Sequence, residues 1–322
     1  MREVYRNESG SYRPIVSVII PTANRPEMLK RAVRSALEQD IDAVEVIVVI
    51  DGSEPNTVAE LRLFGDSRLR VIEVGTRRGG GFARNVGIMH ARGDWIALLD
   101  DDDEWMRHKL RRQLDAANRV AAPYPIMASR LIARTPQRDY IWPRRPIGPQ
   151  EPAADYLFAR SSLFQGEGLL QTSTLLARKQ LFELVPFREL PRHQDWDWLI
   201  RASAREGVVI EIIDEPLAIW YREEHRSTVS GQRGWRFSLT WARELRPLFT
   251  PRAYAAFMLT VVASLAARER DWKALVPVIS EAVRRGEPSL MDWILFLGLW
   301  TIPRNLRRML RRAFSSDKPM AV

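Results

Sequence analysis

The amino-acid sequence predicts an α/β fold: a mostly parallel central sheet flanked by helices, with a C-terminal helical extension. Short β-branched runs alternate with segments of helical periodicity in the N-terminal part, and no hairpin signals separate them. From about Gly234 onward, helical patterns replace this alternation. The 322 residues are therefore expected to form an N-terminal tail (1–13), an α/β domain (14–233) and a helical region (234–322).

The first strand is expected in "IVSVII" (15–20), because a β-branched run closed by Pro21 is typical of a strand buried on both faces. Asn24 with Glu27 three residues later resembles a capping box, and Pro26 suits the first turn of a helix. The apolar residues that follow recur at helical spacing. The chain should thus begin as strand, loop and helix.

The same order then repeats, with strands expected at 44–51, 69–74 and 94–100 and helices at 57–65 and 82–92. Such an alternation favours parallel strands joined by right-handed crossovers. The Pro- and Arg-rich stretch between Pro123 and Pro152 has weak periodicity and is interpreted as a long loop or lid. A further strand is expected at 208–222.

Composition excludes several classes of site. The chain has no cysteine, which rules out a disulfide scaffold, a thiolate metal site and a cysteine nucleophile, and which fits a reducing cytoplasm. Its polar start lacks the apolar core of a secretory signal. We therefore expect a cytoplasmic protein, either free or peripheral on the cytoplasmic face of a membrane.

The formal net charge of +9 is concentrated near the C-terminus, where residues 301–322 hold six basic side chains and one acidic side chain. This segment follows the apolar run "LMDWILFLGLWTIP" (290–303), which is shorter than the roughly 20 residues that span a bilayer as a helix. Two interpretations stay open: an element lying on an anionic membrane surface, or a core helix with a solvated tail. We expect no nucleic-acid partner.

The run "DWIALLDDDDEW" ends a predicted strand with four consecutive carboxylates, Asp100 to Asp103. Like charges at contact distance repel, so a positive partner is expected. Mg²⁺ or Mn²⁺ prefers oxygen ligands and commonly joins one or two carboxylates to substrate phosphates. The alternative is that Asp102 or Asp103 caps a helix predicted at 104–119. Carboxyl ends of parallel strands carry the ligand sites of open sheets, which favours the metal.

Five segments in order, "VSVIIPTANRPEMLKRAVRSAL", "EVIVVIDGS", "GGGFARNVGI", "WIALLDDDDEW" and "RHQDWDWLIR", resemble the family-2 type of inverting glycosyltransferase with a GT-A fold. The resemblance covers about residues 14–230. It implies a nucleotide-diphospho-sugar donor and a divalent metal. Positions that match the family's donor-binding residues are Pro21, Thr22, Arg25, Asp51, Arg84, Asp100 and Asp101.

Within that set, Asp51 matches the residue that hydrogen-bonds the base, with a turn former in "DGSEPN" as the alternative. Arg84 would contact the nucleotide or the Asp run. Asp102 matches the metal ligand, Asp100 or Asp101 would reach the ribose or the metal, and Asp103 is interpreted as a helix cap.

Asp195 in "HQDWDWLIR" matches the family's catalytic base. Such a base is needed because an acceptor hydroxyl must lose its proton to attack the anomeric carbon. The alternative is that Asp195 caps the following helix. His225 could be a third metal ligand or a diphosphate contact, or simply a structural residue. The chain departs from the family pattern at Ile50 and Gln194, where an acid is usual.

The resemblance predicts transfer of a single sugar, most commonly from a UDP-sugar, to a hydroxyl of a glycan or a lipid-linked acceptor in cell-surface polysaccharide or glycoconjugate synthesis. The rival hypothesis is a catalytically degenerate nucleotide-sugar-binding protein or a basic protein that binds a membrane surface. The oligomeric state stays open.

Overall fold

The computed structural model describes residues 13–163, 166–222, 234–303, 306–307 and 309. The chain divides into two compact units, Met1–Ile141 with Leu170–Glu224, and Trp142–Leu169 with His225–Val322. Residues 142–169, which the sequence analysis placed in the α/β domain, thus belong with the helical unit. His225 lies outside the described residues.

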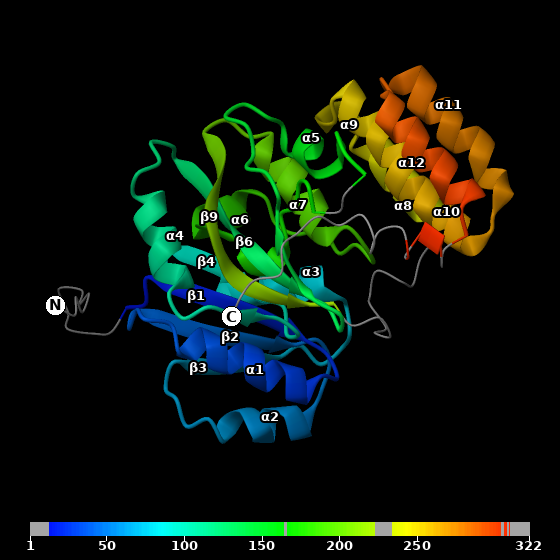
Figure 1. The fold of residues 1–322 in the computed structure, drawn as a ribbon. Helices are drawn as coiled ribbons and strands as arrows, with labels where there is room; N and C mark the ends of the chain where they lie inside the picture. Colours follow the sequence, from blue (N-terminus) through cyan, green and yellow to red (C-terminus); the bar gives the residue numbers. More distant parts are fainter. Residues whose placement is uncertain (1–12, 164–165, 223–233, 304–305, 308, 310–322) are drawn as a thin grey trace. The chain divides into compact units, whose positions relative to one another are not determined.

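In the described part of the chain, one nine-stranded sheet has the order β3-β2-β1-β4-β8-β6-β9-β5, with β7 beside β6 (Figure 1). Its strands are β1 (Val16–Thr22), β2 (Val44–Ile50), β3 (Leu69–Glu73), β4 (Trp95–Leu98), β5 (Glu104–Trp105), β6 (Tyr124–Arg134), β7 (Asp139–Trp142), β8 (Leu176–Arg178) and β9 (Val208–Tyr221).

Strands β3, β2, β1 and β4 are parallel, as the sequence predicts. Every residue of β2 and β4 is buried, which is why their sequences read as apolar runs, interrupted only by Glu45 of β2. Strand β8 is antiparallel to both β4 and β6, and β5 is antiparallel to β9, so the second half of the sheet is mixed. From β1 the chain adds β2 and β3 on one side of the sheet and then β4 on the other side. This change of side creates a switch point between β1 and β4.

The helices of this unit are α1 (Pro26–Leu37), α2 (Pro55–Arg62), α3 (Gly80–His90), α4 (Lys109–Ala117), α6 (Lys179–Leu184), α7 (Gln194–Ser203) and the 3₁₀ turn η1 (Thr172–Thr174). Helix α1 buries its face of Leu29, Ala32, Val33 and Ala36. Gly87 of α3 has no room for a Cβ, which would lie 2.6 Å from Ile19 of β1, so this glycine lets α3 pack closely on the sheet.

Three local predictions were wrong. The interpretation of 123–152 as a long loop fails because β6 lies inside the sheet and is buried on both faces, so its sequence shows no alternation. The capping box at Asn24 is absent: the N-cap of α1 is Arg25, without a side-chain bond, although Pro26 does begin the helix. The helix expected at 104–119 begins only at Lys109, after the short strand β5.

The second unit contains α5 (Ala153–Phe158), α8 (Trp235–Glu244), η3 (Arg246–Leu248), α9 (Pro251–Ala256), the π-helical turn η4 (Phe257–Val262), α10 (Ala263–Glu269), η5 (Trp272–Ala274), α11 (Leu275–Arg285) and α12 (Leu290–Thr301). Its core lies along α9 and η4, where Tyr254 and Phe257 are fully buried. Among the described residues, no helix combines the length and apolar character needed to cross a membrane.

Candidate active site

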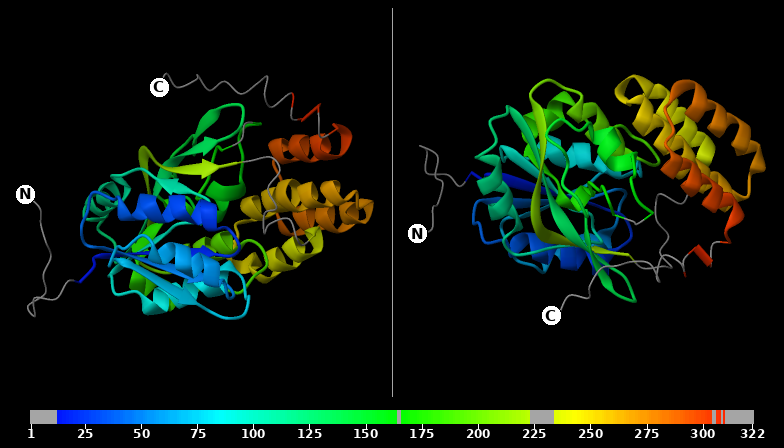
Figure 2. Two further views of the ribbon diagram at one scale, coloured as in Figure 1. Left: turned by 90° about the horizontal axis from the view of Figure 1, so that it is seen from below. Right: turned by 45° about the horizontal axis from the view of Figure 1, so that its top comes forward.

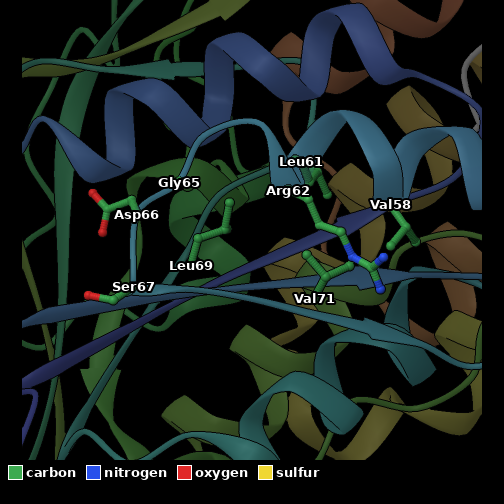
Figure 3. Close-up of a pocket in the computed structure, with 8 residues that line it drawn as sticks. All are labelled: Val58, Leu61, Arg62, Gly65, Asp66, Ser67, Leu69 and Val71. Carbon is green, nitrogen blue, oxygen red and sulfur yellow. The ribbon is translucent and has the colours of Figure 1, made fainter.

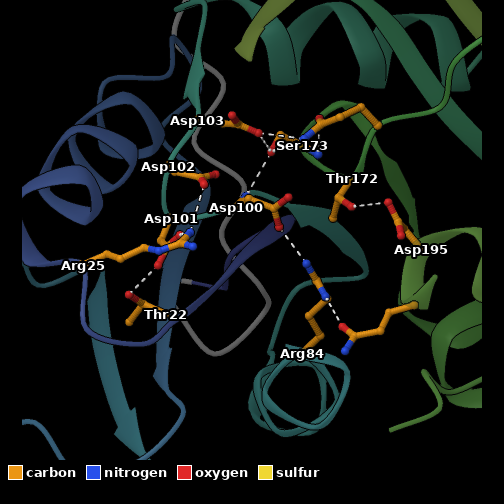
Figure 4. A network of polar contacts seen from close by, with 12 residues as sticks. Thr22, Arg25, Arg84, Asp100, Asp101, Asp102, Asp103, Thr172, Ser173 and Asp195 are labelled. Atoms are coloured by element: carbon orange, nitrogen blue, oxygen red, sulfur yellow. Dashed lines mark hydrogen bonds and ion pairs between the residues drawn. The ribbon is translucent and has the colours of Figure 1, made fainter. Parts of the chain in front are cut away.

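Of the residues predicted to bind a donor, Thr22, Arg25, Arg84, Asp100 and Asp101 gather at the switch point between β1 and β4 (Figure 4). Thr22 is the last residue of β1, Arg25 follows that strand, and the run Asp100 to Asp103 follows β4. Since these strands are adjacent and parallel, their carboxyl ends meet at one edge of the sheet. Pro21 lies inside β1, paired with Val49 of β2, and is partly exposed.

Two arginines neutralise part of the acidic run. Nη1 of Arg25 donates to Asp101 Oδ1 at 3.1 Å and to Asp102 Oδ2 at 2.9 Å, and Nη2 of Arg84 donates to Asp100 Oδ1 at 2.7 Å. Figure 4 shows the two arginines approaching the run from different sides. These ion pairs supply part of the positive charge that we expected next to four consecutive carboxylates.

Asp101 is the most strongly anchored to β1, because its Oδ2 also accepts a hydrogen bond from Thr22 Oγ1 at 2.8 Å. Burial and then the neighbouring charge of Asp102 raise the pKa of Asp101 to about 6, against the opposing effect of Arg25. Buried and tied to β1, this side chain is suited to fixing the loop after β4.

Asp103 is fully buried, and its Oδ2 accepts hydrogen bonds from Ser173 Oγ at 2.6 Å and from Gln171 Nε2 at 2.7 Å. Burial, with the charges of Asp102 and Asp100, raises its pKa well above the ordinary value. The interpretation of Asp103 as a helix cap is wrong, because the N-cap of α4 is His108. The sequence around β4 gave no indication that the Asp103 side chain points into the protein.

The acidic run fits a hard divalent cation. Asp100, Asp102 and Asp103 each offer one oxygen, and these atoms all lie within 4.8 Å of one another. Oδ1 of Asp103 is buried without a hydrogen-bond partner, which is costly for a carboxylate unless a cation contacts it. An all-oxygen donor set is the kind that Mg²⁺ and Mn²⁺ prefer.

Asp51 follows β2 and organises the loop before α3. Its Oδ1 accepts the backbone N–H of Arg78 and its Oδ2 accepts that of Gly79, each at 2.8 Å. Gly79 has a φ of 95°, a conformation that side-chain-bearing residues rarely adopt. Asp51 therefore holds this loop rather than only the turn in "DGSEPN".

Arg84 connects the acidic run to helix α7. While Nη2 binds Asp100, Nη1 donates to Gln194 Oε1 at 3.0 Å, and Gln194 is the first residue of α7. The guanidinium thus fixes the position of α7 relative to β4. The uncharged Gln194 accepts this bond where the family usually has an acid.

Asp195 is the second residue of α7 and is partly exposed. The interpretation of Asp195 as the helix cap is not borne out, because the N-cap is His193 and no side chain caps the helix. Oδ2 of Asp195 accepts a hydrogen bond from Thr172 Oγ1 at 3.2 Å. Burial raises the pKa of Asp195, and the charge of Arg84 opposes this rise.

The neighbouring carboxylate, Asp197, has a structural role. It is fully buried and accepts bonds from Arg188 Nη2 at 2.6 Å and from Arg201 Nε at 2.7 Å. Trp198 is also buried and stacks on Phe182 with ring centroids 4.4 Å apart. Of the two acids in "DWD", only Asp195 is left near the acidic run.

Sequence reasoning missed Gln171, Thr172 and Ser173. These polar residues sit in and beside η1 and are almost fully buried. The only sequence signal was the polar triplet "TST" inside an apolar segment, and its partners lie far away along the chain.

A separate hollow of about 410 Å³ lies between α2 and β3 (Figure 3). It is lined by Val58, Leu61, Arg62, Gly65, Asp66, Ser67, Leu69 and Val71. None of the candidate site residues lines it. We therefore place the chemistry at the β1/β4 switch point.

The fold belongs to the GT-A class, the fold seen in a group of glycosyltransferase structures. The solved mannosyltransferase PcManGT from Pyrobaculum calidifontis, in complex with GDP-Man and Mn²⁺, is 20% identical with a TM-score of 0.51 over 94% of this chain and 84% of that one. At this identity the likeness establishes the shared fold.

The sequence identifies the family. The sequence model of the family described as Glycosyl transferase family 2 matches residues 17–178, which is half of the chain. This chain therefore belongs to glycosyl transferase family 2 and is a glycosyltransferase. The amylovoran biosynthesis glycosyltransferase AmsB of Erwinia amylovora is 29% identical over 76% of this chain and 82% of its own length.

A second relative matches a shorter segment. The UDP-Glc:alpha-D-GlcNAc-diphosphoundecaprenol beta-1,3-glucosyltransferase WfgD of Escherichia coli is 34% identical over 31% of this chain and 40% of its own length. The predicted fold and enzyme class are thus confirmed.

Proposed function

We propose that this glycosyltransferase moves one sugar from a nucleotide-diphospho-sugar to a hydroxyl group with inversion at the anomeric carbon. The observation that carries the proposal is the pair of contacts made by η1: Thr172 binds Asp195, while Ser173 binds Asp103. Consecutive residues of η1 thus hold the carboxylate that we assign as the base and one of the carboxylates that we assign to the metal.

The acidic run is assigned to the donor diphosphate. A bound Mg²⁺ or Mn²⁺ would be held by Asp100, Asp102 and Asp103 and would neutralise charge on the leaving diphosphate. Arg25 and Arg84 hold those carboxylates in place and offset their mutual repulsion. Pro21, Thr22, Asp51 and Asp101 complete the proposed donor pocket, in which Asp51 would hydrogen-bond the nucleobase.

Asp195 is assigned as the base. Its ionised carboxylate accepts the proton of the acceptor hydroxyl as that oxygen bonds to the anomeric carbon and the bond from that carbon to the diphosphate breaks. A single displacement of this kind inverts the configuration. Thr172 orients the carboxylate, and Arg84 favours its ionised form.

For the substrates, we propose a UDP-sugar as the donor and a glycan or lipid-linked glycan as the acceptor. The name of WfgD, a UDP-Glc-dependent enzyme with a diphosphoundecaprenol acceptor, and the name of AmsB, from amylovoran biosynthesis, support a role in cell-surface polysaccharide synthesis. With a lipid-linked acceptor, the enzyme would work at the cytoplasmic face of a membrane.

Calorimetric titration tests the donor assignment. UDP, GDP and dTDP are each titrated with and without Mn²⁺ into wild type and into Asp102→Asn. We expect one nucleotide to bind in a metal-dependent way, and the variant to bind it at least about tenfold more weakly. Asp115→Asn, an exposed acid on α4, is the control and should bind as wild type does. Equal binding with and without metal would refute the assignment.

A further inference from the structure

Helix α12 is apolar on all sides and yet exposed. Its one ionisable residue, Asp292, is buried, closes a capping box with Ser289 and pairs with Arg252. A helix that is apolar all round is normally buried by its neighbours. Here Leu290 is 77% exposed, Ile294 45% and Leu297 57%.

These three residues share one face of the helix, because they are spaced by four and three positions. The left-hand view of Figure 2 shows α12, in orange-red, as the outer layer of the helical unit. Their side chains therefore form a continuous apolar stripe on the outside of that unit.

Tryptophan extends the stripe at its C-terminal end. Trp272 of η5 is 60% exposed, and its ring lies against that of Trp300 of α12 with centroids 4.6 Å apart. Indole rings favour the boundary between hydrocarbon and polar headgroups, because one part is apolar and the N–H is polar. We call Leu290, Ile294, Leu297, Trp300 and Trp272 the α12 face.

Basic residues surround the tryptophan end. Arg268, Arg270 and Lys273, near Trp272 in the sequence, are all exposed; Glu269 and Asp271 alternate with them, and Asp271 pairs with Arg236, so the basic residues outnumber the acidic ones here. In the sequence, residues 304–312 hold five arginines and no acid. Apolar side chains next to a basic cluster complement a surface that offers both hydrocarbon and anionic phosphate.

We propose that the α12 face lies in the headgroup region of an anionic phospholipid bilayer. At about 1.5 Å per residue, the twelve residues of α12 cover only about 18 Å, so the helix would lie along the surface and not across it. A second copy whose α12 helix runs parallel to this one is a poorer occupant, because that two-fold contact would bring the two basic clusters together. The proposal does not rest on the proposed function.

Sedimentation with vesicles tests the proposal. The full chain is mixed with vesicles of phosphatidylcholine alone or of phosphatidylcholine with phosphatidylglycerol. We expect binding to the anionic vesicles, weaker binding at high salt, and at least tenfold weaker binding to neutral ones.

Two variants separate the apolar and basic contributions. The triple variant Leu290→Ser, Ile294→Ser, Leu297→Ser should lose at least tenfold in vesicle affinity, and Arg268→Gln, Arg270→Gln, Lys273→Gln should lose several-fold. Leu63→Ser is the matched control, because Leu63 is 86% exposed but lies in the other unit. Circular dichroism and nucleotide binding report whether each variant is folded.

Three results would overturn the proposal. Two of them are failure of wild type to sediment with either vesicle, and a folded triple variant that binds as tightly as wild type. The third is a wild-type dimer in light scattering that the triple variant converts to a monomer, which would make the α12 face an interface between copies.

Discussion

Thr172 and Ser173 follow one another in η1, and their hydroxyl groups bind carboxylates from two different parts of the site. Thr172 donates to Asp195 at the start of α7, whereas Ser173 donates to Asp103 after β4. Ser173 Oγ also accepts the backbone N–H of Asp100 at 3.0 Å. A rigid, buried turn thus sets the position of the proposed base relative to the proposed metal ligands.

Replacing Thr172 by valine removes the hydroxyl while keeping a similar volume. We expect kcat to fall about tenfold, because Asp195 loses its orienting donor, whereas the KM for the donor should stay nearly constant. Steady-state kinetics with Thr172→Ser, which keeps the hydroxyl, serve as control and should restore most of kcat. An unchanged kcat in the valine variant would show that this contact does not position the base.

The pH dependence of kcat should report the ionisation of Asp195. Because the base must be ionised and burial raises the pKa of Asp195, the acidic limb should lie above the ordinary aspartate value of 3.8. The hydrogen bond from Thr172 lowers this pKa, so Thr172→Val should move the limb to higher pH. A pH–rate profile checks both; a limb that moves to lower pH would contradict the assignment.

Asp103 should contribute to metal affinity and not to helix capping. Asp103→Asn is expected to raise the apparent dissociation constant for Mn²⁺ at least about tenfold, measured by calorimetry in the presence of nucleotide. Ser173→Ala, which removes the hydroxyl that binds Asp103 and the backbone N–H of Asp100 but keeps all three carboxylates, should cause a smaller loss. Because burial disfavours the charge on Asp103, the asparagine variant should be no less stable without metal. Unaltered metal affinity would remove Asp103 from the ligand set.

Burial of Lys109 should make the stability of the folded protein depend on pH, independently of catalysis. It is fully buried, donates to Gln113 and lies over the ring of Trp105, and burial lowers its pKa well below the ordinary lysine value of 10.5. Between the lowered pKa and 10.5 the unfolded chain binds the extra proton, so stability rises with pH and the gain is complete above 10.5.

Chemical denaturation at several pH values tests this. Lys109→Met should remove a slope of up to about 1.4 kcal/mol per pH unit, whereas Lys30→Met, at a partly exposed position of α1, should leave the slope largely intact. The same slope in wild type and in Lys109→Met would mean that Lys109 stays charged in the folded protein.

The sequence predicted the parallel half of the sheet well, because β1, β2 and β4 are buried on both faces and read as nearly continuous apolar runs, with Ser17 in β1 and Glu45 in β2 as interruptions. It also predicted that the Asp run ends β4. It failed for β6, most of which is also buried but whose apolar run is interrupted by Pro125, Ser129 and Arg130. Local composition outweighed a burial that only the neighbouring strands reveal.

The site was predicted in part for a similar reason. Residues directly after β1 and β4 could be placed together because parallel strands align their ends. The contacts of Ser173 with Asp103 and of Arg84 with Gln194 join positions 70 and 110 residues apart, and no local pattern encodes them. The direction of the Asp103 side chain, into the protein and not toward a helix end, could come only from the tertiary structure.

Release of nucleoside diphosphate is the most direct test of the proposed chemistry. Wild type, Asp102→Asn and Asp195→Asn are each incubated with UDP-, GDP- and dTDP-sugars and Mn²⁺ or Mg²⁺, where water slowly replaces the acceptor. We predict release from one class of donor by wild type, with a loss of about a hundredfold or more in both variants. No release from any donor by wild type, or release by Asp195→Asn at the wild-type rate, would contradict the account.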